Sequence, residues 1–296
     1  MTENTIYAWA SDYASNSGEG NLARMYISYL KNTYNYKFIF NKKKKLNKYL
    51  SSYIGILYCW NYYLKNRKVA YINYIPFWNF LIFLFLPPGT IIGPITGGAL
   101  FNKKNLFNYF TRKYLFHFFY KISEFLLNFR STNLVFSTDL LKIYLSKKTI
   151  KKSNFNFVLK NFKFKKLEKK KNDFLIYYRK HQNKENQFPY DLIKRLIDLN
   201  FKICVIGDKL NIPLVKNYGI VSNKKVSKLQ SISKYTIASN ENPYSLFIIE
   251  CLSNNMKILI DKKKKNKFKL FKCRIIEISL NNVKNLKKIK SKLNFN

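Results

Sequence analysis

The segment Ser239–Leu252 reads Ser-Asn-Glu-Asn-Pro-Tyr-Ser-Leu-Phe-Ile-Ile-Glu-Cys-Leu and follows a short β-type run, Tyr235–Ala238. A strand, a polar turn and an apolar helical run form the arrangement in which open α/β sheets bind ligands, at the carboxyl ends of their strands. Pro243 suits the first turn of such a helix, where a backbone N–H is not needed. The free N–H groups at that end attract phosphate.

Two carboxylates flank the apolar run of this segment. Glu241 lies on the predicted turn and can accept hydrogen bonds from a sugar or a ribose, and Glu250 lies well inside the predicted helix, where it can face the same site. The alternative is an ordinary capped helix with Glu250 in a surface salt bridge. A short motif does not decide between these interpretations, so the rest of the chain has to.

Length and composition indicate a globular α/β protein of about two domains. The chain has 296 residues, of which 47% are hydrophobic, enough for packed cores. Residues 146–172 are rich in Lys, Asn and Phe and contain neither Gly nor Pro. We place the domain boundary there and predict domains of residues 1–150 and 151–296.

The net charge of +40 would ordinarily indicate a nucleic-acid or membrane partner. Only seven of the 55 basic residues are arginine, and Asn, Ile, Phe and Tyr are also abundant. All of these, like lysine, have AT-rich codons, so we attribute much of the charge to codon bias. Scarce arginine argues against specific nucleic-acid readout. A basic nucleic-acid-binding or membrane-surface protein without catalysis remains the alternative.

Strand ends in the second half, which has the pattern of repeated βα units, carry polar groups. Arg179-Lys180, Gly207-Asp208 and Asn240-Glu241 each follow a predicted strand. Parallel strands bring such groups to one edge of a sheet. A basic pair beside a helix N-terminus suits a diphosphate, and a neighbouring carboxylate suits sugar hydroxyls. The pattern outlines a nucleotide-sugar site, with routine polar loops as the alternative.

The first half contains two glycine-rich loops. A predicted strand, Ile6–Ala10, leads into residues 11–21 with Gly18-Glu19-Gly20, and a helical pattern follows. This loop lacks the Gly-Lys-Ser/Thr of a phosphate-binding loop and the third glycine of GxGxxG. That absence also argues against a dehydrogenase or epimerase of the dinucleotide-binding type. The second loop, Pro87–Gly98, needs special backbone angles or close approach by a partner, or serves as a structural crossover.

Together these motifs resemble those of retaining GT-B glycosyltransferases of the "glycosyltransferase group 1" type. The resemblance rests on the loop Gly18-Glu19-Gly20, the loop Gly93–Gly98, the pair Arg179-Lys180 and the span from Glu241 to Glu250. The family's motif has seven residues between its two glutamates, whereas eight separate them here. Glu250 is therefore the firmer match, and Glu241 or a neighbour such as Asn240 fills the first position.

The resemblance implies two Rossmann-like domains with parallel sheets facing a cleft, the acceptor on the first and the nucleotide-sugar on the second. It implies that Arg179 and Lys180 stabilise the departing diphosphate, with Glu241 as a third catalytic residue at the donor sugar. The implied donor-binding residues, with Glu250 on the ribose, are Gly207, Asp208, Asn240, Asn242, Pro243, Tyr244, Ser245 and Glu250. The implied acceptor-side residues are Ser17, Gly18, Glu19, Gly20, Gly93, Pro94, Thr96, Gly97 and Gly98.

The partners implied are a nucleotide-sugar donor and a glycan, polysaccharide or lipid-linked acceptor. We expect no metal and no cofactor, since the sequence shows no Asp-x-Asp and no Cys or His spacing typical of zinc. We see no signal peptide, and the longest apolar run, Phe77–Leu86, is shorter than the roughly 20 residues of a spanning helix. We therefore expect a cytoplasmic protein, with its lysines allowing peripheral contact with an anionic membrane on its inner face.

Overall fold

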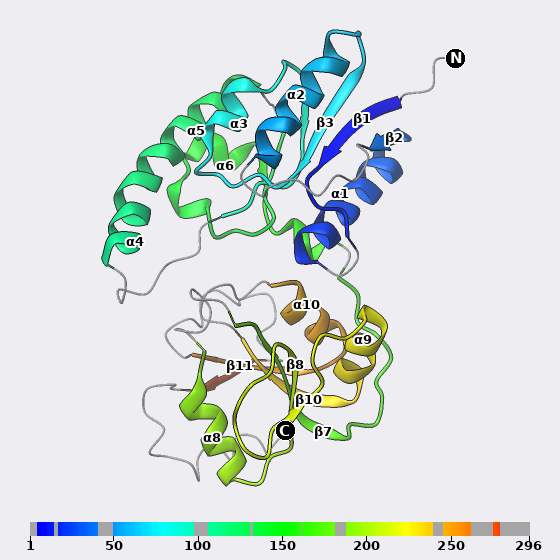
Figure 1. Ribbon diagram of the computed structural model, residues 1–296, viewed down its shortest axis with the longest axis vertical. Coiled ribbons are helices and arrows are strands. Elements are labelled where there is room, and N and C mark those ends of the chain that lie inside the picture. Colours follow the sequence, from blue (N-terminus) through cyan, green and yellow to red (C-terminus); the bar gives the residue numbers. More distant parts are fainter. Residues whose placement is uncertain are drawn as a thin grey trace. The chain divides into compact units, whose positions relative to one another are not determined.

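A computed structural model of the chain describes residues 5–14, 17–40, 50–97, 106–130, 133–160, 162–180, 188–238, 245–261 and 275–278. The chain divides into two compact units (Figure 1). Among the described residues, the first unit contains everything up to residue 160, and the second contains everything from Phe162 onward. Each unit is an α/β structure built on parallel strands, as the sequence predicts.

The first unit consists of short strands that alternate with helices. Its strands are β1 (Thr5–Ala10), β2 (Lys37–Phe40), β3 (Lys68–Asn73), β4 (Ile91–Ile92), β5 (Leu134–Val135) and β6 (Ser153–Asn154). Its helices are α1 (Gly18–Tyr34), α2 (Ser51–Tyr63), α3 (Phe80–Phe85), α4 (Leu106–Phe110), the π-helical η1 (Thr111–Leu115), α5 (Phe116–Arg130), the 3-10 turns η2 (Lys142–Tyr144) and η3 (Phe157–Leu159), and α6 (Lys147–Lys151).

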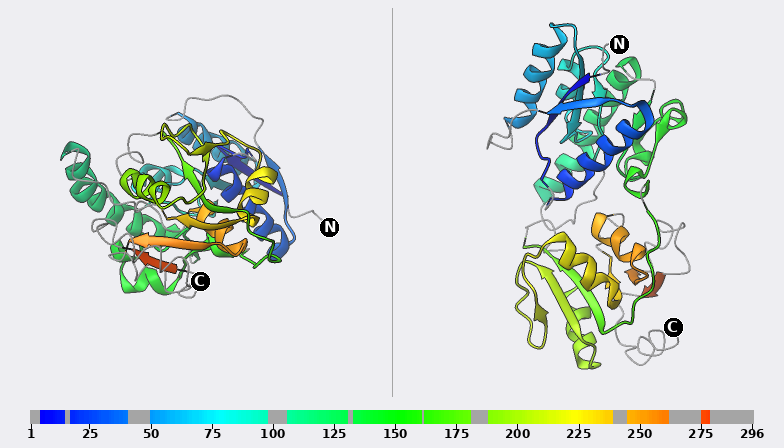
Figure 2. Two further views of the ribbon diagram at one scale, coloured as in Figure 1. Left: turned by 90° about the horizontal axis from the view of Figure 1, so that it is seen from below. Right: turned by 90° about the vertical axis from the view of Figure 1, so that its right-hand side faces the viewer.

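The main sheet of this unit has the strand order β2-β1-β3-β4, and every pairing is parallel. Beyond β4, a single bridge between Ile95 and Phe136 leads to the small parallel pair β5-β6. Side chains of β1 alternate between its two faces: Tyr7 stacks on Tyr62 of α2, and Trp9 packs against Tyr58 of the same helix. Helix α1 covers the opposite face of the sheet from α2 (Figures 1 and 2).

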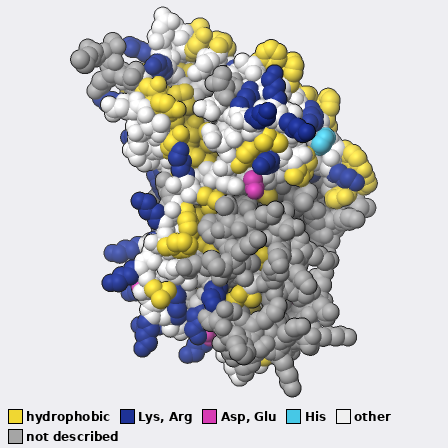
Figure 3. Space-filling model, turned by 180° about the vertical axis from the view of Figure 1, so that it is seen from behind, with side chains coloured by type: hydrophobic (Ala, Val, Ile, Leu, Met, Phe, Trp, Pro, Cys, Tyr) yellow, Lys and Arg dark blue, Asp and Glu magenta, His cyan; other side chains and the backbone are white. Residues whose placement is uncertain are grey.

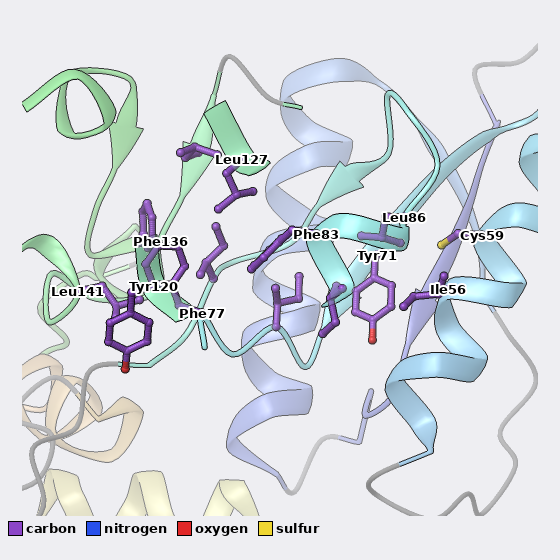
Figure 4. Close-up of a cluster of buried hydrophobic side chains, with 14 of the residues drawn as sticks. Ile56, Cys59, Tyr71, Phe77, Phe83, Leu86, Tyr120, Leu127, Phe136 and Leu141 are labelled. Carbon is purple, nitrogen blue, oxygen red and sulfur yellow. The ribbon is translucent and has the colours of Figure 1, made fainter. Parts of the chain in front are cut away.

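The core of the first unit is unusually aromatic. Phe77 lies at its centre, fully buried, with its ring against those of Phe83, Tyr120 and Phe136 (Figure 4). These residues come from α3, α5 and the segments beside β3 and β5, so one cluster joins the far side of the unit to the sheet. The apolar run Phe77–Leu86 contributes to this core, because Phe77, Ile82, Phe83 and Leu86 are fully buried, while Leu84 and Phe85 are exposed.

The second unit is one six-stranded parallel sheet with the order β12-β11-β10-β7-β8-β9. In chain order this is the 3-2-1-4-5-6 arrangement of dinucleotide-binding folds. Its strands are β7 (Asn172–Tyr178), β8 (Ile203–Gly207), β9 (Lys216–Asn217), β10 (Ser233–Ile237), β11 (Lys257–Asp261) and β12 (Ile275–Ile278). Its helices are α8 (Tyr190–Asp198), α9 (Asn223–Ser231) and α10 (Leu246–Ser253).

Strand β7 is buried on both faces and divides its side chains between two cores. Phe174 and Ile176 pack with Leu192 and other apolar residues of α8. Leu175, which points the other way, packs with Leu229 of α9 and with Cys251 of α10. A near-continuous apolar strand of this kind is typical of a parallel sheet covered by helices on both sides.

Two local predictions from the sequence are wrong: a strand at Phe155–Leu159 and a helix whose first turn includes Pro243. Residues 155–159 do not form a strand: the paired residues are Ser153–Asn154, and Phe157–Leu159 forms a 3-10 turn. Asn156 has a left-handed backbone with φ of 57°, which ends the extended run. Helix α10 begins at Leu246, capped by Ser245, so its first turn does not include Pro243.

Within the described ranges, no helix is long and apolar enough to cross a membrane. Cys59, Cys204 and Cys251 are buried free thiols, as predicted, and Cys273 lies outside the described residues.

Candidate functional site

The sheet of the first unit changes direction at β1, because β2 lies on one side of this strand and β3 on the other. Ligands of open α/β sheets bind beyond the carboxyl ends of the strands at such a switch point. The chain leaves β1 at Ala10 and enters α1 at Gly18, so the loop between them lies at this point. Four predicted acceptor-side residues, Ser17, Gly18, Glu19 and Gly20, stand at its end.

Asp12 and Ser17 organise this loop. The Asp12 carboxylate accepts hydrogen bonds from the backbone N–H of Ala14, at 2.8 Å, and from the Ser17 hydroxyl. The Ser17 Oγ in turn accepts from the N–H of Gly20 at 2.8 Å and so caps α1. This is the standard serine N-cap, reinforced by a carboxylate behind it and by Glu19 in the positively polarised first turn.

Asn73 closes the switch point from the side of β3. This buried residue is 3% exposed. Its Oδ1 accepts from the Ser11 hydroxyl and from the N–H of Asp12, while its Nδ2 donates to the backbone oxygens of Asp12, at 2.6 Å, and of Glu19, at 3.2 Å. Sequence reasoning missed both Asp12 and Asn73. The sequence feature that could have indicated them is a polar residue at or just after the end of a strand, Asp12 after β1 and Asn73 at the end of β3.

Glycines of the predicted acceptor loops allow close backbone approach. A Cβ on Gly20 would lie 2.1 Å from the backbone oxygen of Ala14, and one on Gly93 would lie 2.0 Å from that of Ile72. Gly93 also donates its N–H to the oxygen of Tyr71 at 2.7 Å, which joins the end of β4 to β3. Gly97 has φ of 136°, and Gly98 lies outside the described residues.

Thr96 and Pro94 have structural contacts as well. The N–H of Thr96 donates to the oxygen of Ile75, and its own oxygen accepts from the N–H of Phe77. Pro94 is buried between β4 and the Ile95–Phe136 bridge. The contacts described for this second loop therefore hold the edge of the sheet together.

Tyr74, directly after β3, lies in the electrostatic field of charged residues from two other elements. Burial raises the pKa of its phenol, the negative charge of Glu19 raises it further, and the positive charge of Arg112 opposes the rise. Arg112 belongs to the π-helical segment η1, and π-helical turns are frequent at functional sites. The first switch point thus carries a carboxylate, a phenol and a guanidinium besides its structural network.

The second sheet has its switch point between β7 and β10. Arg179 and Lys180 follow β7 immediately, and both are exposed. The N–H of Lys180 donates to Oδ2 of Asp208 at 2.6 Å, and the N–H of Asp208 donates to the oxygen of Tyr178 at 3.0 Å. The structure therefore brings the predicted pairs Arg179-Lys180 and Gly207-Asp208 together, with both cationic side chains in solvent.

Gly207 makes this junction possible. Its φ is 100°, and a Cβ there would lie 2.1 Å from the oxygen of Tyr178. Its N–H donates to the oxygen of Gly219 at 3.0 Å. Only glycine fits this backbone, so β8 can turn sharply enough for Asp208 to reach the main chain beyond β7.

The loop after β10 lies partly outside the described residues. Asn240, Glu241, Asn242, Pro243 and Tyr244 all fall within this undescribed segment, residues 239–244. Ser245, the next residue, accepts a hydrogen bond from the N–H of Ile248 at 3.4 Å and caps α10.

Glu250 lies more than one turn into α10. Its carboxylate accepts a hydrogen bond from Nε2 of Gln230, at 3.4 Å. The positive charge of Lys165 also interacts with this carboxylate and lowers its pKa. Gln230 is itself buried and also bonds Asn254, so it ties α9 to α10. The contacts described for Glu250 are with these residues and not with Arg179, Lys180 or Asp208. Gln230 is a further residue that sequence reasoning missed.

The pKa of the Glu250 carboxyl is raised. Glu250 as a residue is exposed, yet the protein around its carboxylate withdraws enough water to disfavour the charged form. The hydrogen bond from Gln230 and the charge of Lys165 act in the opposite direction and offset only part of this effect.

No group of three or more His, Cys, Asp or Glu side chains able to hold a metal ion occurs in the part of the chain that the structure describes.

Comparison with solved structures identifies the fold of this chain. A glycosyltransferase from Rickettsia africae aligns over 100% of this chain and 89% of its own, with 13% identity and a TM-score of 0.52. A UDP-GlcNAc 2-epimerase from Methanocaldococcus jannaschii, solved with UDP-GlcNAc and UDP, aligns over 98% and 92%, with 10% identity and a TM-score of 0.52. The chain has the GT-B fold.

HepE of Anabaena, solved with UDP and glucose, shows the same GT-B likeness. It aligns over 97% of this chain and 92% of its own, with 8% identity and a TM-score of 0.51. No protein-family model and no curated protein matches the sequence. At these identities the likeness establishes the fold, so the function has to be argued from the residues.

Proposed function

We propose that this protein is a glycosyltransferase that transfers a sugar, with retention, from a nucleotide-diphosphate sugar to a hydroxyl of a glycan, polysaccharide or lipid-linked acceptor. The observation that carries the proposal is the exposed pair Arg179-Lys180, fixed by Asp208 at the switch point of a 3-2-1-4-5-6 sheet. A diphosphate bound there would meet two exposed cationic side chains, neither of which forms an ion pair with another of the described residues.

The chemistry of the pair suits a departing nucleotide diphosphate. Negative charge grows on the leaving diphosphate as the bond to the sugar breaks. A guanidinium and an ammonium at this strand end would stabilise that charge. The hydrogen bond from the Lys180 N–H to the Asp208 carboxylate joins the backbone just after β7 to the end of β8.

Other residues of the second unit complete the proposed donor site. In this proposal Glu241 and the turn around it contact the donor sugar, and Glu250 accepts a hydrogen bond from the ribose. The raised pKa of Glu250 fits a carboxylate partly withdrawn from water before any ligand binds. Glu250→Ala should then weaken nucleotide binding, by less than loss of the Arg179-Lys180 pair, and unchanged binding would show that this residue has only a structural role.

The acceptor is assigned to the first unit in this proposal. Glu19 and Tyr74 carry groups able to hydrogen-bond an acceptor hydroxyl, and the negative charge of Glu19 contributes to the raised pKa of the Tyr74 phenol. The network of Asp12, Ser17 and Asn73 would hold the backbone around Glu19 in place.

Support also comes from what similar proteins bind. The M. jannaschii epimerase was solved with UDP-GlcNAc and UDP, and HepE of Anabaena with UDP and glucose. Uridine diphosphate and uridine-diphosphate sugars are therefore the first probes to try.

A thermal-shift panel of nucleotide diphosphates and their sugar conjugates tests the proposal. A ligand that binds only the folded protein stabilises it by about 2.7 kcal/mol at 100 times its dissociation constant. At least one diphosphate should raise the midpoint by several degrees, while the matching nucleoside should not. If no nucleotide raises it, the proposal fails.

Incubation with the nucleotide-sugar found in that panel distinguishes a transferase from an epimerase. A transferase needs an acceptor hydroxyl, whereas an epimerase changes the donor sugar alone. Incubation of the stabilising nucleotide-sugar without acceptor should leave its sugar unaltered. Appearance of an epimeric sugar would overturn the assignment as a transferase.

A further inference from the structure

The helical segment formed by α4, η1 and α5 carries an aromatic stripe on its solvent side. The stripe consists of Phe107, Phe110, Tyr114, Phe118, Phe125 and Phe129. These side chains are between 53% and 80% exposed. Their spacing of three, four, four, seven and four residues keeps them along one side of the helical segment.

The stripe is not the face by which the segment packs on its own unit. Tyr120, Ser123, Glu124 and Leu127 are the buried residues of α5, and Leu127 belongs to the hydrophobic core. The segment is thus apolar on two sides, one in the core and one in solvent. Amphipathic helices of globular proteins normally present polar residues on the solvent side.

Exposed residues of α3 extend the stripe. The Arg130 guanidinium donates to the backbone oxygens of Leu84, at 2.7 Å, and Leu86, at 2.5 Å, which ties the end of α5 to the end of α3. Leu84 and Phe85, at the end of α3, are both exposed. Phe129, which directly precedes Arg130 in the sequence, is exposed as well. The end of α3 that carries these exposed residues is therefore joined to the end of α5 that carries Phe129.

A basic group lies beside the stripe. The exposed Lys113 ammonium is 5.0 Å from the ring centre of Tyr114, a residue of the stripe, and 5.6 Å from that of Tyr109. The only acidic residue among residues 106–130 is Glu124, which is buried. Figure 3 shows hydrophobic side chains lying among Lys and Arg side chains on one face of the first unit.

We propose that this surface docks the protein on an anionic phospholipid bilayer, with the aromatic stripe at the level of the headgroups. Aromatic rings combined with Lys and Arg are the composition by which helices lie in the membrane interface. Lys113 would contact lipid phosphates while the ring of Tyr114 beside it enters the apolar boundary. Docking of this kind needs no spanning helix and adds a location to the activity proposed above.

The charge on the surface argues for lipid over a second copy of this chain. In a symmetric dimer the same patch faces itself, so Lys113 would oppose its own kind, with no exposed carboxylate from residues 106–130 to pair with it. An anionic bilayer supplies the complementary charge.

Co-sedimentation with vesicles tests this inference. The full chain should sediment with vesicles that contain phosphatidylglycerol and far less with phosphatidylcholine alone. The triple substitution Phe118→Ser, Phe125→Ser and Phe129→Ser should weaken binding by about tenfold or more, since each removes an exposed ring that would leave water. Lys113→Gln should weaken binding less, and mainly at low salt.

A matched control replaces equally exposed apolar residues of the second unit, Leu167→Ser and Ile220→Ser, and should leave vesicle binding unchanged. Circular dichroism and nucleotide-induced thermal shift check that the triple variant is folded and binds donor. Binding by the triple variant equal to that of the unaltered chain would overturn the inference. So would a concentration-dependent dimer that the triple substitution abolishes without any vesicle binding by the unaltered chain.

Discussion

Each switch point of this protein uses an aspartate to hold the main chain, Asp12 in the first unit and Asp208 in the second, but the side chains around it differ. In the first unit, Asp12, Ser17 and Asn73 satisfy one another and the backbone around them, and Asn73 is almost fully buried. In the second, Arg179 and Lys180 leave their charged groups in solvent, and only the backbone of Lys180 is held, by Asp208.

This difference separates a scaffold from a candidate ligand site. A polar network that is internally satisfied gains stability and has little left to offer a ligand. Cations that are positioned but not neutralised keep their full attraction for an anion. Within the described residues, the second switch point is therefore where we expect the diphosphate to bind, while the first holds the loop that carries Glu19.

Removal of both cations of the second switch point should have the largest effect on binding. Arg179→Ala with Lys180→Ala removes two charge-assisted contacts, each worth about 1.5–3 kcal/mol, so the dissociation constant for uridine diphosphate should rise at least about 100-fold. Isothermal titration calorimetry measures this change.

The adjacent pair Lys194 and Arg195 on α8 provides the matched control for that double substitution. Lys194→Ala with Arg195→Ala removes the same charge from the same unit and should leave the dissociation constant within about twofold, because distant exposed charges are screened. Equal losses in both double variants would mean that only net charge matters.

Replacement of Asn73 should affect stability and leave binding alone. Asn73→Ala leaves buried backbone groups of the first loop without partners and should lower the free energy of unfolding by about 2 kcal/mol. All three tryptophans, Trp9, Trp60 and Trp78, lie in the first unit, so fluorescence in urea reports its unfolding. Exposed Asn61→Ala on α2 is the control, expected within about 0.5 kcal/mol of the unaltered chain.

The smallest effect is expected at Glu250. Its folded-state pKa is raised, so the folded chain binds this proton more tightly than the unfolded chain, and the contribution to stability is lost as pH rises through the raised pKa. Glu250→Gln should therefore raise the unfolding midpoint at about pH 7, with a gain that shrinks toward about pH 4.

Circular dichroism at a series of pH values measures the gain from Glu250→Gln. Glu168→Gln, in the same unit and bonded to the Ser231 hydroxyl, serves as the control and should give no gain. A lower midpoint for Glu250→Gln at neutral pH would show that the ionised carboxylate stabilises α10.

The sequence predicted most of the fold because its strands are strongly patterned. Phe174–Tyr178 and Ile203–Ile206 are nearly all apolar and β-prone, and each ends in a polar or glycine residue, so both strands and their ends could be placed. Short runs fared worse: Phe155–Leu159 has a strand-like composition, but left-handed Asn156 breaks it. Composition in five residues does not distinguish a strand from a 3-10 turn.

The candidate site was predictable only in part. The contact between Lys180 and Asp208 follows from neighbouring parallel strands, whose ends meet at one edge of a sheet. The contacts of buried Asn73 could not be predicted, because its partners lie 54 to 62 positions away in the chain. The bond between Gln230 and Glu250 could not be predicted either, because it joins two helices through residues 20 positions apart. Sequence motifs locate strand ends but not the partners that reach them from other elements.

Hydrogen exchange with and without uridine diphosphate tests the central claim most directly. If the second switch point binds the diphosphate, backbone amides of residues 178–180 and 207–208, and those of the first turn of α10, should become protected. Amides of residues 12–20 in the first unit should not change. Protection confined to residues 12–20, or protection nowhere in the chain at saturating nucleotide, would contradict the account.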